Sequence, residues 1–242
     1  MKIIYYTLSS VDSTNDWIKR FVGPIEKDSL LLVRADAQTK GKGRRGNLWH
    51  SPAGKNLYLS LGLDLSQACL PQLSSVGQIA SLAAMLAIEE LYGITLGIKW
   101  PNDLLHDGKK VGGILVETVV GEDSIRLIVG IGINVHSTKE ELSQVGLQAL
   151  SLTDISGRTI AIDMLVQAIE RQFTLLWEKG FDPLLDLYRS SLIHKAGDTI
   201  AFRHESRRIE GVFLEITEKG LLRLLESDGE VSEWVAGEIL VC

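Results

Sequence analysis

A run of glycines and cations, residues 38–47 (QTKGKGRRGN), must interrupt the regular structure of the N-terminal half of the chain. Three glycines alternate with four cations, and no acidic residue lies between them. Glycine loses the most backbone entropy on ordering, so this run is a poor helix and a poor strand. We therefore expect a flexible loop in which Gly41, Gly43 and Gly46 adopt positive φ and turn successive N–H groups toward an anion.

The side chains of this loop predict what kind of anion it meets. Lys42, Arg44 and Arg45 supply full charges, and the arginine fork suits a carboxylate or a phosphate. A solvated basic turn is the alternative. The chain as a whole is acidic, with 31 acidic against 25 basic residues and a net charge of −6. This balance favours a local anion site formed by four unpaired cations over a surface that coats nucleic acid.

Size and composition predict a globular protein. The 242 residues, 45% of them hydrophobic, suit one substantial domain plus a small one. Cys69 and Cys242 are too few for a disulfide framework or a zinc site, and the histidines share no ligand spacing, so we expect no metal-ligand set. Because no signal peptide or membrane-spanning run is visible, we expect a cytoplasmic protein without membrane contact.

In the N-terminal half, residues 2–8 and 30–36 read as strands, and the leucines of 56–65 alternate as in a half-buried strand that serves only the core. Ser13-Thr14-Asn15 stands before helically spaced apolar residues. These three residues either cap a helix or present short polar groups to a small ligand, and beside the basic loop we expect both. A helix over 71–92 should stop at Gly93.

The middle of the chain predicts strands at 94–100, 111–120 and 125–135. Pro101 ends the first of these, and residues 107–110 (DGKK) form a hairpin turn. Lys99 and Lys110 thus flank one hairpin beside the small pair Gly112-Gly113, which suggests that the two lysines converge on a site.

The C-terminal part changes character. Residues 136–158 are polar and read as irregular, Asp163 caps a helix that runs to Lys179, and a short helix follows over 182–192. Five short strands then occupy 199–241, as in a small SH3-like barrel that packs on the larger domain. We therefore divide the chain into domains 1–194 and 195–242.

No serine nucleophile elbow, metal cluster or catalytic cysteine setting is visible, and the basic loop fits neither a Walker A motif nor a dinucleotide fingerprint. A cationic site with polar and apolar walls remains. Such a site suits a reaction that gathers negative charge on phosphate and is catalysed by positioning and charge neutralisation.

The order of several motifs adds a resemblance. Ser13-Thr14-Asn15, Gln38-Thr39, GKGRRG followed by Trp49, SPAGKNL, KWPNDL, KKVGGILVE and GIGINV succeed one another over residues 10–136. Together they resemble biotin protein ligases. The resemblance implies an α+β fold with a mixed, mostly antiparallel sheet and packed helices, like class II synthetases, plus a small C-terminal SH3-like barrel.

The resemblance also implies a reaction. Biotin and ATP, with Mg²⁺, form biotinyl-5′-AMP, and a lysine of a biotin carboxyl carrier protein of acetyl-CoA carboxylase, or of a similar carboxylase, then takes the biotin. The implied catalytic residues are Lys110, Lys99, Arg44 and Asp103. The implied biotin-binding residues are Ser13, Thr14, Asn15, Gln38, Gly41, Lys42, Gly43, Arg44, Lys110 and Gly113. The implied ATP- or adenylate-binding residues are Arg44, Arg45, Trp49, Lys99, Asn102, Lys110 and Asn134.

Two residues depart from the family pattern. Lys42 stands where the family often has arginine, which removes a bidentate fork, and Lys40 stands where a small residue is common. The chain begins at the catalytic domain, so we expect no DNA-binding helix-turn-helix. A homodimer and a monomer both stay open. A lipoate–protein ligase and a non-catalytic biotin-binding or carrier-docking protein are the alternative functions.

Overall fold

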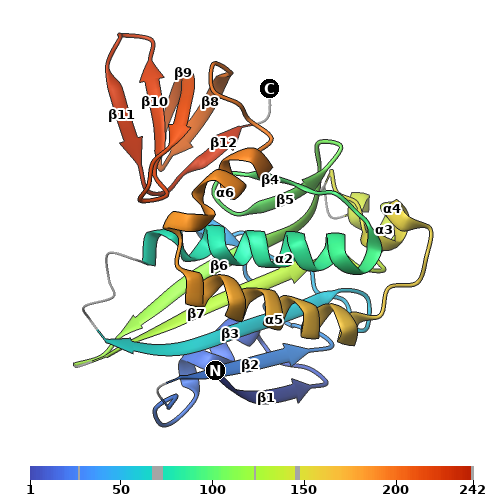
Figure 1. Cartoon of the computed structure of the whole chain (residues 1–242). Helices are drawn as coiled ribbons and strands as arrows, with labels where there is room; N and C mark the ends of the chain where they lie inside the picture. The colour runs from blue at the N-terminus through green and yellow to red at the C-terminus, as the bar shows by residue number, and fades with distance from the viewer. Residues whose placement is uncertain (27, 67–72, 123, 145–147, 241–242) are drawn as a thin grey trace.

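The computed structural model describes residues 1–26, 28–66, 73–122, 124–144 and 148–240. Its elements form a large domain and a smaller C-terminal sheet (Figure 1). The N-terminal elements are β1 (Lys2–Leu8), α1 (Thr14–Arg20), β2 (Ser29–Ala35), η1 (Arg44–Gly46), β3 (Leu57–Ser66) and α2 (Val76–Tyr92). The middle elements are β4 (Gly97–Lys99), β5 (Asp103–His106), β6 (Lys109–Val120), β7 (Ser124–Ile133), α3 (Lys139–Gln144), α4 (Leu152–Ser156) and α5 (Ile162–Lys179). The C-terminal elements are η3 (Asp182–Leu184), α6 (Leu185–Ser191), β8 (Thr199–His204), β9 (Arg207–Ile216), β10 (Leu222–Glu226), β11 (Val231–Trp234) and β12 (Glu238–Leu240).

The large sheet has seven strands in the order β1-β2-β3-β7-β6-β5-β4. Only its β1–β2 pair is parallel, and the other pairs are antiparallel. Helices α2 and α5 lie side by side across one face, where the main core forms (Figure 1). Helix α1 packs on the opposite face, where Ile18 meets Leu31 and Ile128 in a second apolar cluster. The expected mixed, mostly antiparallel sheet with packed helices is confirmed.

The prediction that β3 is half-buried and serves only the core is wrong. The strand pairs with β2 on one side and β7 on the other, and residues 57–63 are all buried. Its leucines face the main core, whereas Ser60 donates hydrogen bonds to Thr14 and Asn15 of α1. Leucines do alternate with other residues along β3, but helix α1 covers the face that does not carry the leucines. The sequence of the strand does not reveal this helix.

Two helix starts also differ from the prediction. Helix α2 begins at Val76 after a 3-10 turn at 73–75, and Pro71 lies outside the described residues; the stop at Gly93 is confirmed, with φ of 65°. Helix α5 begins at Ile162, so its N-cap residue is Ala161, which has no side chain that can cap. Asp163 lies within the first turn, and its carboxylate pairs with Arg34 of β2.

Residues 136–158 are more regular than predicted, since they contain α3 and α4. Ser151 and Asp154 form a capping box at the start of α4, in which each side chain accepts a hydrogen bond from the other's backbone N–H. A serine followed three residues later by an aspartate is a sequence signal for the start of a helix, and the prediction of an irregular segment overlooked it.

The C-terminal strands form one antiparallel sheet in the order β11-β10-β9-β8-β12, which confirms the expected small β domain. It packs on the large domain through Phe202, whose ring centroid lies 6.1 Å from that of Trp100. The carbonyl of Gly220 accepts hydrogen bonds from Gln78 (2.9 Å) and Trp100 (3.2 Å). Buried apolar residues of both sheets form one continuous cluster, and the division after residue 194 stays a prediction. Cys69 and Cys242 lie outside the described residues.

Candidate active site

A cavity of about 410 Å³ opens between α1, the basic loop, the β4–β5 turn and the strands β6 and β7. The predicted site residues that line it are Ser13, Thr14, Asn15, Gln38, Lys42, Gly43, Arg44, Arg45, Trp49, Lys99, Asn102, Asp103, Lys110, Gly113 and Asn134. Gly41 does not line it. A Cβ at Gly41 would lie 2.4 Å from the carbonyl oxygen of Trp49, so this glycine permits a close backbone crossing behind the loop.

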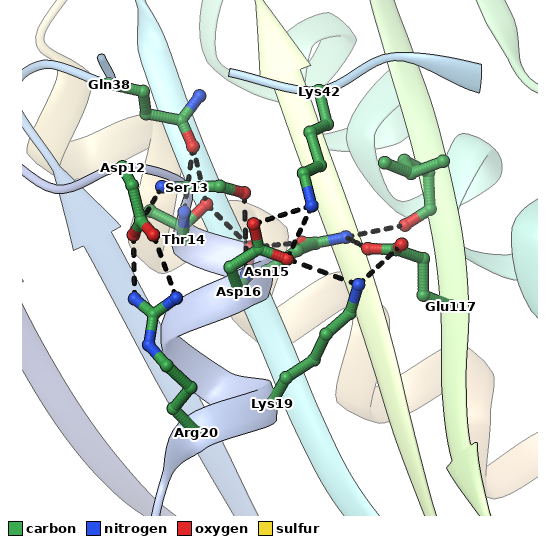
Figure 2. A network of polar contacts seen from close by, with 12 residues as sticks. Asp12, Ser13, Thr14, Asn15, Asp16, Lys19, Arg20, Gln38, Lys42 and Glu117 are labelled. Carbon is green, nitrogen blue, oxygen red and sulfur yellow. Dashed lines mark hydrogen bonds and ion pairs between the residues drawn. The ribbon is translucent and has the colours of Figure 1, made fainter. Parts of the chain in front are cut away.

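One end of the cavity has neutral polar walls. Ser13 caps α1 by accepting from the N–H of Asp16, as predicted. The Oε1 of Gln38 accepts from both the N–H (2.9 Å) and the Oγ1 (3.1 Å) of Thr14. The Nε2 of Gln38 donates to the Oγ of Ser51 at 3.0 Å, so the amide is held in one orientation. Figure 2 shows Gln38 meeting the first turn of α1.

Asn15 forms the floor of this polar end. It is only 3% exposed, and its Nδ2 donates to Glu117 (2.9 Å) and to the carbonyl of Leu115 (3.4 Å). Its Oδ1 accepts from Ser60 at 2.5 Å. Because these contacts already engage both ends of the amide, Asn15 acts here by fixing the neighbouring strands and the α1 terminus.

The opposite end of the cavity is charged. The Nζ of Lys110 lies 2.6 Å from Asp103 Oδ1, and the Nζ of Lys99 lies 3.6 Å from Asp103 Oδ2. The β5–β6 hairpin turns at Asp107-Gly108, both with positive φ, and its register places Asp103 opposite Gly113. The structure thus brings the two lysines together on one carboxylate.

The basic loop folds differently from the predicted nest. Among its three glycines, only Gly46 has positive φ (76°), and Arg45 shares this conformation with φ of 54°. The N–H of Gly43 donates to the carbonyl of Asn47 at 2.7 Å. The loop therefore closes on itself as the 3-10 turn η1, and its backbone N–H groups do not form the expected series of anion donors.

The prediction of unpaired cations is wrong for two of the four. Lys42 pairs with Asp16 at 2.6 Å, and Arg45 pairs with Glu238 at 3.5 Å and donates to the carbonyl of Arg203 (2.9 Å). Arg44 donates from Nη1 to neutral oxygens, of Asn102 (3.0 Å) and of the Gly237 carbonyl (2.9 Å). Burial, followed by the nearby Arg45, lowers the pKa of Arg44 below its ordinary value. The loop is thus held by contacts that lie far away in sequence.

Trp49 lies over the middle of the cavity. A Cβ on Gly132 would come within 2.6 Å of the indole ring, so the ring rests directly on the backbone of β7. The Nζ of Lys110 lies 5.6 Å from the ring centroid, within cation–π range. The indole Nε1 is buried and has no hydrogen-bond partner among the described residues. A ligand oxygen placed here would satisfy it.

Several lining residues were not predicted as site residues. They are Asn47, Leu48, Tyr58, Leu59, Trp100, Pro101, Ile114, Leu115, Gly130, Ile131, Gly132, Ala149 and Glu238. The sequence carried a signal for Gly130 and Gly132, because glycines inside an apolar strand mark a close approach. No sequence signal pointed to Glu238, because it lies on β12 of the C-terminal sheet and reaches the cavity only through the packing of that sheet on the large domain.

Residues 7–134 match the biotin/lipoate A/B protein ligase family. The chain belongs to this family. It is 30% identical over 238 residues to the bifunctional ligase/repressor BirA of Escherichia coli, covering 96% of this chain and 72% of that protein. It is 35% identical over 213 residues to BirA of Bacillus subtilis, covering 82% of this chain but only 62% of that protein.

The fold agrees with this membership. The biotin protein ligase from Aquifex aeolicus, solved in complex with biotin and ATP, superposes with a TM-score of 0.77 at 30% identity. The match covers 99% of this chain and 97% of that one. Within the described ranges, no group of three or more His, Cys, Asp or Glu side chains gathers as a metal site. No helix in those ranges is both long enough and apolar enough to span a bilayer.

Proposed function

We propose that this protein is an ATP-dependent ligase that activates biotin as biotinyl-5′-AMP and transfers it to a lysine of a biotin carboxyl carrier protein. The observation that carries the proposal is the division of one cavity into a neutral polar end at Thr14 and Gln38 and a cationic end at Lys99 and Lys110. A family relative that binds both biotin and ATP supports it.

The polar end suits the head group of biotin. An uncharged cyclic urea needs fixed donors and acceptors at close range, and Ser13, Thr14 and Gln38 provide them from a capped helix terminus. The apolar lining residues of β6 and β7, such as Leu115 and Ile131, accommodate the aliphatic part, with Gly113 leaving room beside Lys110. The biotin carboxylate then reaches the cationic end.

The cationic end suits the first half-reaction. The biotin carboxylate must attack the α-phosphate of ATP, forming a C–O–P bond while pyrophosphate leaves. Two such unit charges about 4 Å apart repel by about 4 kcal/mol at an effective dielectric near 20. Lys110 and Lys99 offset this repulsion, and Lys110 exchanges its Asp103 partner for the substrate anions. Asn134 and Trp49 contact the nucleotide side, together with Arg45 and Asn102.

The second half-reaction uses the same carboxylate. The amine of the carrier lysine attacks the acyl carbon of the mixed anhydride, an amide forms, AMP leaves and the amine gives up a proton. When Lys110 moves to the phosphate, Asp103 keeps only Lys99, and its freed Oδ1 orients the incoming amine. Arg44 holds the loop over the adenylate and excludes water.

The remaining expectations complete the proposal. Mg²⁺ accompanies the triphosphate, as this cation usually does, because it takes most of its ligands from phosphate and water. It neutralises phosphate oxygens when bound. The partner is the biotin carrier of acetyl-CoA carboxylase or of a similar carboxylase, and the compartment is the cytoplasm.

The test is an assay with labelled biotin, ATP and a carrier domain. Transfer of label that requires ATP, with release of pyrophosphate that requires biotin, supports the proposal. Transfer of lipoate in place of biotin would identify a lipoate–protein ligase. Binding of biotin without pyrophosphate release would identify a non-catalytic biotin-binding protein.

A further inference from the structure

We propose that Asp16 is a positioning residue that latches the basic loop to helix α1 through Lys42. The effect of this contact on the retention of biotinyl-5′-AMP rests on the proposed function. The contact itself, and its effect on the mobility of the loop, do not. Lys42 is the residue that departs from the arginine often found in the family. Its Nζ lies 2.6 Å from Asp16 Oδ2 and 2.8 Å from Oδ1.

The acceptor is itself held in place. Asp16 sits in the first turn of α1, with its side chain only 16% exposed, and Lys19 of the next turn contacts it at 3.2 Å. Lys19 also pairs with Glu117 of β6 at 2.7 Å. Glu117 in turn accepts from the amide of Asn15 at 2.9 Å. Figure 2 shows this chain of contacts running from Lys42 to the strand β6.

The charge state of Asp16 agrees with this role. Burial raises its pKa, but hydrogen bonds from Lys42 and Lys19 outweigh burial and lower the pKa below its ordinary value. The carboxylate is therefore ionised at neutral pH and meets two cations. A partly buried ion pair of this kind is screened by salt less than a fully exposed one.

The latch joins the loop to the elements that form the polar end of the cavity. On its other side the loop is held by Arg44, which donates to the carbonyl of Gly237, and by Arg45, which donates to the carbonyl of Arg203. The loop is thus tied between α1 and the C-terminal sheet. Loss of the Asp16 contact should let the loop open on the α1 side while its C-terminal anchors stay in place.

The ammonium of Lys42 reaches both oxygens of one carboxylate, at 2.6 Å to Oδ2 and 2.8 Å to Oδ1 of Asp16. A guanidinium could also pair with this carboxylate, so the contact depends on the charge of Asp16 and not on lysine in place of arginine.

Hydrogen–deuterium exchange of the backbone amides of residues 41–49, measured on the whole chain without ligands, tests the latch. Asp16→Asn should speed exchange of these amides about two- to fivefold, the range that one such ion pair supports. Asp16→Glu, which keeps the carboxylate between Lys42 and Lys19, should preserve the parent rate. Exchange of the core amides of α2 serves as the reference for global stability.

Asp12→Asn is the matched control, because the Asp12 carboxylate pairs with Arg20 and only its backbone carbonyl, which the substitution keeps, accepts from the loop at Lys40. It should leave loop exchange unchanged. Equal loop exchange in Asp16→Asn and the parent, or loop exchange in Asp16→Glu as fast as in Asp16→Asn while α2 stays protected, would overturn the latch. Release of biotinyl-5′-AMP, measured in parallel, should rise by the same factor in Asp16→Asn. If no adenylate forms in the parent, the proposed function fails while the exchange result still decides the latch.

Discussion

Replacement of Lys110 by methionine gives the sharpest test of the charge argument. Methionine keeps much of the side-chain length and removes the charge that lies 2.6 Å from Asp103. Asp103 keeps Lys99 at 3.6 Å, so we expect the variant to fold. A unit charge about 4 Å from an anion contributes about 1 kcal/mol in water and about 4 kcal/mol at an effective dielectric near 20.

The side chain of Lys110 is 34% exposed, so its contribution lies between these limits. Because each 1.36 kcal/mol is about tenfold in rate, we expect adenylation to slow by roughly 10- to 100-fold. Pyrophosphate release in a single turnover, with saturating biotin and ATP, measures this step. Transfer from pre-formed biotinyl-5′-AMP, measured separately, should change less.

Lys109→Met is the control, because Lys109 is the adjacent exposed residue on the same strand. It should adenylate biotin at the parent rate. The reasoning is refuted if Lys110→Met adenylates as fast as the parent and loses only transfer, since the charge would then serve the second half-reaction alone.

Three further predictions follow from the geometry. Arg44→Ala removes the bonds to Asn102 and Gly237, and should leave the thermal unfolding temperature within a few degrees while biotinyl-5′-AMP escapes about tenfold faster; equal retention would argue against its role. In Gly132→Ala the new Cβ would lie 2.6 Å from the indole of Trp49, so the ring must shift by about 1 Å and the KM for ATP should rise about tenfold or more; an unchanged KM would show that the ring does not serve the nucleotide. The hydrogen bond from the Arg20 guanidinium lowers the pKa of Asp12 from 3.8 to about 2. The ionised Asp12 therefore stabilises the fold fully above about pH 4, and this stabilisation disappears as the pH falls toward 2. Acid unfolding of Asp12→Asn should lack this part of the pH dependence, and an unfolding curve parallel to the parent's would contradict the prediction.

Local features of this protein could be predicted because they depend on residues a few positions apart. Ser13 caps α1, Gly93 ends α2, and Asp107-Gly108 turns the β5–β6 hairpin that brings Lys110 to Asp103, which pairs with Lys99 of β4. The ordered motifs likewise identified the family and most of the residues that line the cavity.

The sequence by itself therefore determined which loop is basic, which lysines flank the hairpin and which family the chain joins. Only the tertiary structure decided what the loop cations contact. Arg44 of η1 meets Gly237, which precedes β12 of the C-terminal sheet, and Asn15 of α1 meets Glu117 of β6. The burial of the second face of β3 likewise depends on the tertiary structure, because α1 packs on that face. Each of these contacts depends on how separate elements pack in three dimensions, and that packing leaves no periodicity or spacing in the segments themselves.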